Sequence, residues 1–170
     1  MRKNGFTIVE TSLVLAIGGL IIVLAFVVLP GLWRSQRDSQ RKDDLMVFAD
    51  AVKKWQSNAN RGALPEKKAE LDEVKDKYIK GTFEDPSLGT AYTLLYYSCD
   101  NESGSTSIAS TECPAMKGIR EAEISNNVTG KIHFVAGAYC DGNKAVKSPN
   151  SRKAALLYKL EVNELYCYDL

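Results

Sequence analysis

The chain has one long run of apolar residues near its start. Thr11 to Trp33 are 23 consecutive residues without a charge. At 1.5 Å per residue, a helix of this length spans about 34 Å, and the hydrocarbon core of a bilayer is about 30 Å thick. The run therefore predicts a helix that can cross a membrane.

Beyond this run the pattern becomes amphipathic. Apolar residues recur at helical spacing at Leu45, Phe48, Ala49, Val52 and Trp55, and charged residues, Arg41 among them, lie between them. This spacing predicts a helix that continues directly from the apolar run and packs one stripe against a domain. We therefore expect a single helix from about Phe6 to Ser57.

Two pairs of residues interrupt the good helix formers. Pro30-Gly31 should bend the helix, because proline lacks a backbone donor and clashes with the preceding turn. Gly18-Gly19 weakens the helix by about 1 kcal/mol per glycine. The glycine pair fits either local unwinding or close packing between helices, and the sequence favours neither.

The rest of the chain predicts a short helix followed by a sheet. Residues 67–80 form a weakly amphipathic helix, and residues 81–89 have the composition of turns. Residues that suit strands lie at Tyr92–Cys99, Lys131–Cys140, Ala154–Glu161 and Leu165–Tyr168, the last two as a hairpin. Residues 100–111 and 141–152 are predicted surface loops. The expected fold class is α+β, with an antiparallel sheet of about four strands on the amphipathic half of the long helix.

The residues before the apolar run form an unusual motif. A short basic leader ends in Gly5, and Phe6, Thr7 and the carboxylate of Glu10 follow. A charge in hydrocarbon costs roughly 2.5 to 3.5 kcal/mol, so Glu10 needs a partner. This motif resembles the N-terminus of type IV pilins and pseudopilins. In the alternative interpretation, Glu10 lies at headgroup depth at the start of an ordinary anchor helix.

The resemblance implies a specific processing step. A prepilin peptidase would cut after Gly5 and methylate the new N-terminal Phe6. The new amine would lie on the same helix face as Glu10, four residues on, which could neutralise its own amine or that of a neighbouring subunit. The resemblance implies the second. The segment Asp85 to Tyr92 also resembles the aspartate-proline turn that leads into the sheet in many pilins.

These patterns divide the chain into three parts. Residues 1–5 are the expected leader peptide, and residues 6–33 the transmembrane or filament-core helix. Residues 34–170 are a pilin-like globular domain, in which 34–58 form the amphipathic half of the helix and 59–170 the sheet and loops.

Four cysteines, Cys99, Cys113, Cys140 and Cys167, allow three pairings. Loop lengths favour Cys99 with Cys113 and Cys140 with Cys167. Disulfides favour an oxidising compartment for the globular domain, outside the cytoplasmic membrane. The count of Lys and Arg flanking the apolar run favours the opposite topology, and we follow the cysteines. The apolar run is too long, and lacks the small-residue cleavage site, for an ordinary signal peptide.

Candidate chemistry is sparse. Lys and Arg number 22 against 21 acidic residues, so nucleic acid binding is not indicated. His133 falls in an apolar strand, where a structural imidazole is the better interpretation. Asp141 and Asn143 lack the dense acidic ligands of a calcium site. We therefore expect no enzyme activity, no catalytic residues, no metal and no cofactor.

The function that the resemblance implies is that of a structural subunit of a type IV pilus, for adhesion, motility or uptake. The chain would lie in the cytoplasmic membrane before assembly and in a cell-surface pilus afterwards. Its partners would be other copies of itself, the prepilin peptidase and the pilus assembly platform. The alternatives are a minor pilin or pseudopilin of a type II secretion or competence machine, and an anchored extracytoplasmic domain that never polymerises.

Overall fold

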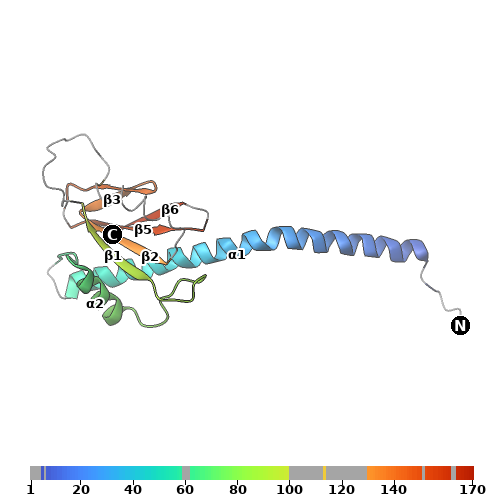
Figure 1. Cartoon of the computed structure of the whole chain (residues 1–170), viewed down its shortest axis with the longest axis horizontal. Helices are drawn as coiled ribbons and strands as arrows, with labels where there is room; N and C mark the ends of the chain where they lie inside the picture. The colour runs from blue at the N-terminus through green and yellow to red at the C-terminus, as the bar shows by residue number, and fades with distance from the viewer. Residues whose placement is uncertain are drawn as a thin grey trace. The chain divides into compact units, whose positions relative to one another are not determined.

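The computed structural model describes residues 5, 7–58, 62–99, 113, 130–150, 152–161 and 164–170. The chain divides into two compact units, Met1–Arg37 and Asp38–Leu170. One helix, α1 (Ile8–Asn58, 51 residues), contributes to both. The two units are described separately below (Figure 1).

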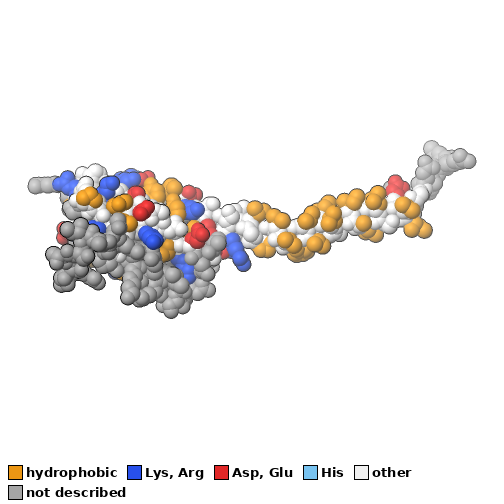
Figure 2. All heavy atoms as spheres, turned by 90° about the horizontal axis from the view of Figure 1, so that it is seen from above, with side chains coloured by type: hydrophobic (Ala, Val, Ile, Leu, Met, Phe, Trp, Pro, Cys, Tyr) orange, Lys and Arg blue, Asp and Glu red, His pale blue; other side chains and the backbone are white. Residues whose placement is uncertain are grey.

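The first unit contains the apolar part of α1. The helix is continuous through Pro30, where the sequence predicted a bend. Its side chains from Ile8 to Trp33 are exposed on all faces, and Figure 2 shows hydrophobic groups along it. By length and composition α1 can cross a membrane, and none of its most apolar stretch is buried within the chain. An apolar helix without an internal partner suggests a membrane anchor or a signal segment.

In the second unit the amphipathic half of α1 packs against the rest of the domain, as predicted. Its buried stripe comprises Leu45, Phe48, Ala49, Val52 and Trp55. A second helix, α2 (Lys68–Tyr78), lies within the range predicted for it and buries Leu71 and Val74 in the same core. The stripe thus forms the helical side of the core on which the sheet packs.

A four-stranded sheet covers this core. Its strands are β1 (Thr93–Ser98), β2 (Lys131–Ala136), β5 (Ala154–Lys159) and β6 (Leu165–Asp169), in the order β1-β2-β5-β6. β5 and β6 pair antiparallel, as the predicted hairpin requires, and β2 pairs antiparallel with β5. These four strands confirm the α+β class.

The expectation of a purely antiparallel sheet is wrong. β1 and β2 run parallel, with Thr93 opposite Lys131 and Ser98 opposite Ala136, so the sheet is mixed. Parallel neighbours need a crossover connection of a dozen or more residues. The chain between Cys99 and Gly130 is long enough to provide one, whereas strand composition alone does not encode direction.

The predicted strand Lys131–Cys140 is divided in two. Gly137 has φ +70°, which favours glycine, and it ends β2 and begins β3 (Ala138–Asp141) in a separate sheet. β3 pairs antiparallel with β4 (Lys144–Lys147), inside the segment 141–152 that was predicted to be a loop. The missed signal is the turn at Gly142, where φ is +59°, because Gly-Asn between two strands is typical of two-residue hairpins.

The second unit therefore has three layers. One face of the four-stranded sheet packs on α1 and α2, through Ile132, Phe134 and Leu156. The opposite face, through Val135 and Leu157, packs under the β3-β4 hairpin (Figure 1). Because both faces are covered, every residue of β5 is buried.

Two disulfides staple this arrangement. Cys99 pairs with Cys113 and Cys140 with Cys167, the pairs that loop lengths favoured. The second bridge ties β3 to β6 and so fixes the hairpin to the sheet. Cys113 also donates its backbone N–H to the Ala145 carbonyl of β4 at 3.1 Å. The outer layer is thus held covalently as well as by packing.

Replacing both cysteines of either pair with serine should lower the free energy of unfolding. The loops closed are 14 and 27 residues long, for which chain entropy gives about 3 and 3.5 kcal/mol respectively. Urea unfolding of the full chain in detergent micelles, followed by tryptophan fluorescence, measures both losses. An unchanged unfolding midpoint for Cys140→Ser/Cys167→Ser would contradict the structural role of that bridge.

Candidate functional site

The residues predicted for processing and assembly lie at the start of α1. Gly5 is exposed and outside the helix, whereas Phe6 lies outside the described residues. Glu10 is in the first turn of α1 and is also exposed. An acidic residue in the first turn is favoured by the helix dipole, which lowers the cost of placing it there.

The helix has a cap that the sequence analysis missed. Thr7 precedes the first helical residue, and its Oγ1 accepts the backbone N–H of Glu10 at 3.3 Å. The Thr7 carbonyl accepts the N–H of Thr11 at 3.2 Å. These bonds identify Thr7 as the N-cap, and the spacing Thr-x-x-Glu of the capping box was the available signal.

The two hydroxyl residues after Glu10 are satisfied within the helix. Thr11 Oγ1 donates to the Ile8 carbonyl at 3.0 Å, and Ser12 Oγ donates to the Val9 carbonyl at 2.9 Å. Hydroxyls in an apolar helix commonly bond back to its own carbonyls in this way. Their presence therefore adds little polarity to the first unit.

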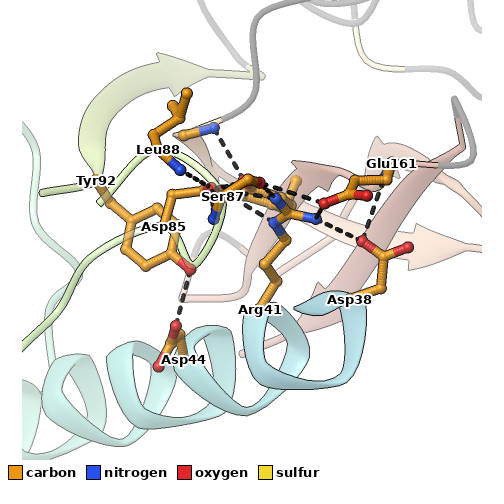
Figure 3. A network of polar contacts seen from close by, with 10 residues as sticks. Asp38, Arg41, Asp44, Asp85, Ser87, Leu88, Tyr92 and Glu161 are labelled. Atoms are coloured by element: carbon orange, nitrogen blue, oxygen red, sulfur yellow. Dashed lines mark hydrogen bonds and ion pairs between the residues drawn. The ribbon is translucent and has the colours of Figure 1, made fainter. Parts of the chain in front are cut away.

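A second group of polar residues is buried in the globular unit. Arg41 is fully buried, and its Nε and Nη2 donate to the two carboxylate oxygens of Asp85 at 2.9 and 3.1 Å (Figure 3). Its Nη1 donates to Asp38 at 2.7 Å and Glu161 at 3.0 Å, and Nη2 also bonds the hydroxyl of Ser87. We call these five residues the Arg41 cluster. The assignment of Arg41 to the polar face of the helix was wrong.

Asp85 is the second centre of the Arg41 cluster. Its Oδ1 accepts the backbone N–H groups of Ser87 at 2.8 Å and Leu88 at 3.1 Å, so it also closes the turn that follows it. Its Oδ2 accepts the hydroxyl of Tyr158 from β5. The aspartate that the sequence assigned to a turn motif is therefore also a buried counter-ion.

Two tyrosines extend the contacts of this region. Tyr158 accepts the N–H of Gly130 at 2.9 Å, just before β2 begins. Tyr92, after the turn, donates to Asp44 of α1 at 2.8 Å. The helix, the turn and β5 are thus linked by polar bonds as well as by packing, and Figure 3 shows the bonds around the turn.

The pKa values reflect this pairing. Burial alone would lower the pKa of Arg41, but its hydrogen bonds with Asp85 and Asp38 outweigh that effect and raise it. Burial would raise the pKa of Asp85, yet hydrogen bonds from Arg41, Tyr158 and Ser87 bring it well below the usual range. Burial and the bond to Asp85 raise the pKa of Tyr158. At neutral pH the cluster therefore contains an ionised pair held beside a neutral phenol.

The arrangement is structural in kind. All three nitrogens of the Arg41 side chain donate to acceptors of this chain. These bonds position α1 against the turn and β5. His133 is buried in β2, with its ring centre 5.6 Å from that of Tyr97. Within the described ranges no three His, Cys, Asp or Glu side chains gather as metal ligands.

Comparisons with known proteins give no match for this chain among family profiles, curated proteins or solved structures. The architecture itself is pilin-like, because a long N-terminal apolar helix is followed by a β-sheet with two disulfides.

Replacing Asp85 with asparagine should destabilise the globular unit strongly. The change removes the bidentate counter-ion of a buried guanidinium, which typically costs about 3 to 5 kcal/mol. Urea unfolding of the full chain in micelles at pH 7 measures the loss. Asp50→Asn is the matched control, because among the described residues Asp50 forms only an exposed pair with Lys53 at 3.9 Å, worth less than about 1 kcal/mol.

The cost of Asp85→Asn should also depend on pH. The folded pKa of Asp85 is lowered, so its contribution is complete above the unfolded value of about 3.9 and is lost as the pH falls towards the folded pKa. The difference in unfolding free energy between wild type and variant should therefore be constant from pH 7 to about 5 and shrink below about 4. A difference independent of pH down to 2 would show that Asp85 is not held ionised.

Proposed function

We propose that this chain is a structural subunit of a type IV pilus, cleaved after Gly5 and polymerised through the apolar part of α1 that lies in the first unit. The observation that carries the proposal is the first unit itself. Its apolar side chains are exposed on every face, and one carboxylate, Glu10, stands in its first turn. A helix of this kind requires a partner outside its own chain.

The partner of the apolar surface changes during the proposed assembly. Before assembly, lipid covers the helix. In the filament, helices of neighbouring copies replace the lipid. Because lipid already satisfies apolar surface, association must be driven by close packing and by specific polar pairs. Close packing depends on the small residues of the helix, and a polar pair depends on its charged residue.

The glycines of the first unit support contacts beyond the single chain. A Cβ atom added at Gly5, Gly18 or Gly19 would meet nothing within 4 Å among the described residues. The fold of one chain therefore gives no steric reason for glycine at these positions. Peptidase recognition explains Gly5, and close approach of a neighbouring helix or local unwinding in the filament explains Gly18-Gly19.

Glu10 supplies the polar pair. Within the described part of the chain its carboxylate has no ion pair, although its position in the first turn suits a negative charge. Cleavage after Gly5 would create an amine at Phe6, and a neighbouring copy could present that amine to Glu10. The pair would form only after processing, so assembly of uncut chains would be disfavoured.

The globular unit supports an extracytoplasmic position. Disulfides persist in oxidising compartments, and this unit carries two of them. Two bridges and an added hairpin layer also favour a specialised head. For this reason the second candidate is a minor pilin or pseudopilin of a secretion or uptake machine, which would be scarce in sheared surface filaments where a major subunit dominates.

Protein recovered from the native membrane should begin at N-methylated Phe6. Intact-mass analysis, with sequencing of the N-terminal peptide, tests this directly. The same measurement on Gly5→Val should recover the uncut chain. Recovery of native protein that still begins at Met1 would rule out processing, and would leave the anchored domain that never polymerises.

Glu10→Ala should still insert and still be cut, but assemble poorly. We expect filament yield to fall at least tenfold, because the amine of each neighbour loses its counter-charge inside apolar surroundings. Yield is measured in sheared fractions against total cut protein. Ser12→Ala is the control, since it removes a polar group of the same helix that is already satisfied internally. Wild-type yield from Glu10→Ala would remove the assembly role.

A further inference from the structure

Two neighbouring apolar side chains are exposed on the part of α1 that belongs to the globular unit. Met46 is 42% exposed and Val47 is 49% exposed, although the opposite face of this part of the helix is buried in the core. In the described part of this unit, Leu88 of the turn after Asp85 is the other large apolar side chain that is exposed. The globular unit thus leaves one face of its own helix uncovered.

Charged residues flank this apolar pair on the same face of the helix. Asp43 precedes it, and Asp50 and Lys54 follow it, each three or four residues from the next and each exposed. Among the described residues neither Asp43 nor Lys54 forms an ion pair, and Asp50 pairs with Lys53 at 3.9 Å. We call the following residues the Met46 patch: Asp43, Met46, Val47, Asp50 and Lys54.

The Met46 patch is too small to hold a partner by itself. A stable protein interface buries roughly 1,200 to 2,000 Å² in total, and two half-exposed side chains supply a small part of that area. Docking here therefore requires a partner that another contact already holds close, because that contact raises its effective concentration. Copies of this chain that share a membrane through their apolar helices meet this requirement, whereas a freely diffusing protein does not.

We propose that the Met46 patch docks a second copy of this chain, with the two α1 helices parallel and shifted by about one turn. The inference rests on the proposed function, because assembly brings copies side by side with their helices in the same direction. Without a shift, Asp50 would face Asp50 and Lys54 would face Lys54, and like charges repel. A shift of four residues, about 6 Å along the helix, places Asp50 of one copy opposite Lys54 of the next.

The same shift suits the rest of the patch. The apolar pairs of the two copies stay within one helical turn of each other, so part of their surface leaves water. Asp43 of one copy comes level with Val47 of the next, so no like charges of the patch meet. The contact is also asymmetric, since each copy offers Asp50 to one neighbour and Lys54 to another. Asymmetric contacts of this kind can build an open filament.

Site-directed cross-linking of native filaments tests the shift. The four native cysteines are paired in disulfides, so a single cysteine introduced at an exposed site reacts selectively. When two full-length copies are made together, Asp50→Cys in one and Lys54→Cys in the other should give several times more dimer with a short bismaleimide than Lys54→Cys in both. Lys68→Cys with Asp72→Cys, an exposed pair at the same spacing on α2, is the matched control and should give background yield.

Charge exchange tests the ion pair itself. Asp50→Lys or Lys54→Asp alone should lower the yield of sheared filaments roughly fivefold, which is the largest effect expected of one exposed ion pair. The double variant restores opposite charges between copies and should recover most of the yield. The matched exchange Lys68→Asp/Asp72→Lys on α2 should leave the yield unchanged. Urea unfolding in micelles should be close to wild type for all four variants, because the exchanged side chains are partly or fully exposed.

Three outcomes would overturn the inference. The first is equal joining of the shifted and unshifted cysteine pairs, and the second is a double charge variant that assembles no better than the single ones. The third is a cross-link from the patch to a protein of another mass, which would give the patch a different partner. If the wild-type chain is present in the membrane but forms no filaments, it is the proposed function that fails.

Discussion

The globular unit depends on the burial of one guanidinium. Arg41 lies on α1, and its partners come from the turn at Asp85 and from Glu161, just after β5. Removing a cation from water costs several kcal/mol, which only well-placed carboxylates and hydrogen bonds offset. The Arg41 cluster is therefore weak evidence for high stability, and its bonds join the helix, the turn and the residue that follows β5.

The two units differ in whether their apolar surface is buried within the chain. From Asp38 onward, α1 buries its apolar stripe against its own chain, and the sheet is covered on both faces. From Ile8 to Trp33 the same helix buries nothing within the chain. The first unit is consequently the part whose apolar surface the chain itself leaves uncovered, and the second is the part that folds around its own core.

The carboxylates of Glu10 and Asp85 are stabilised by the same kind of interaction. Glu10 tolerates an apolar helix because it stands in the first turn, where free backbone N–H groups and the helix dipole favour an anion. Asp85 tolerates burial because a guanidinium, a phenol and two backbone N–H groups surround it. The Asp85 carboxylate serves two purposes, since it closes the turn that follows it and pairs with Arg41.

The sequence by itself determined the long helix, the buried stripe from Leu45 to Trp55, the short second helix, the strand-forming segments and the favoured cysteine pairs. These follow from periodicity, composition and loop length, which are local. Only the tertiary structure decided that β1 and β2 run parallel, that Gly137 divides one strand into two sheets, and that Arg41 turns inward to Asp85. Strand direction and the partner of a charge depend on residues distant in the chain. A local pattern along the sequence therefore does not predict them.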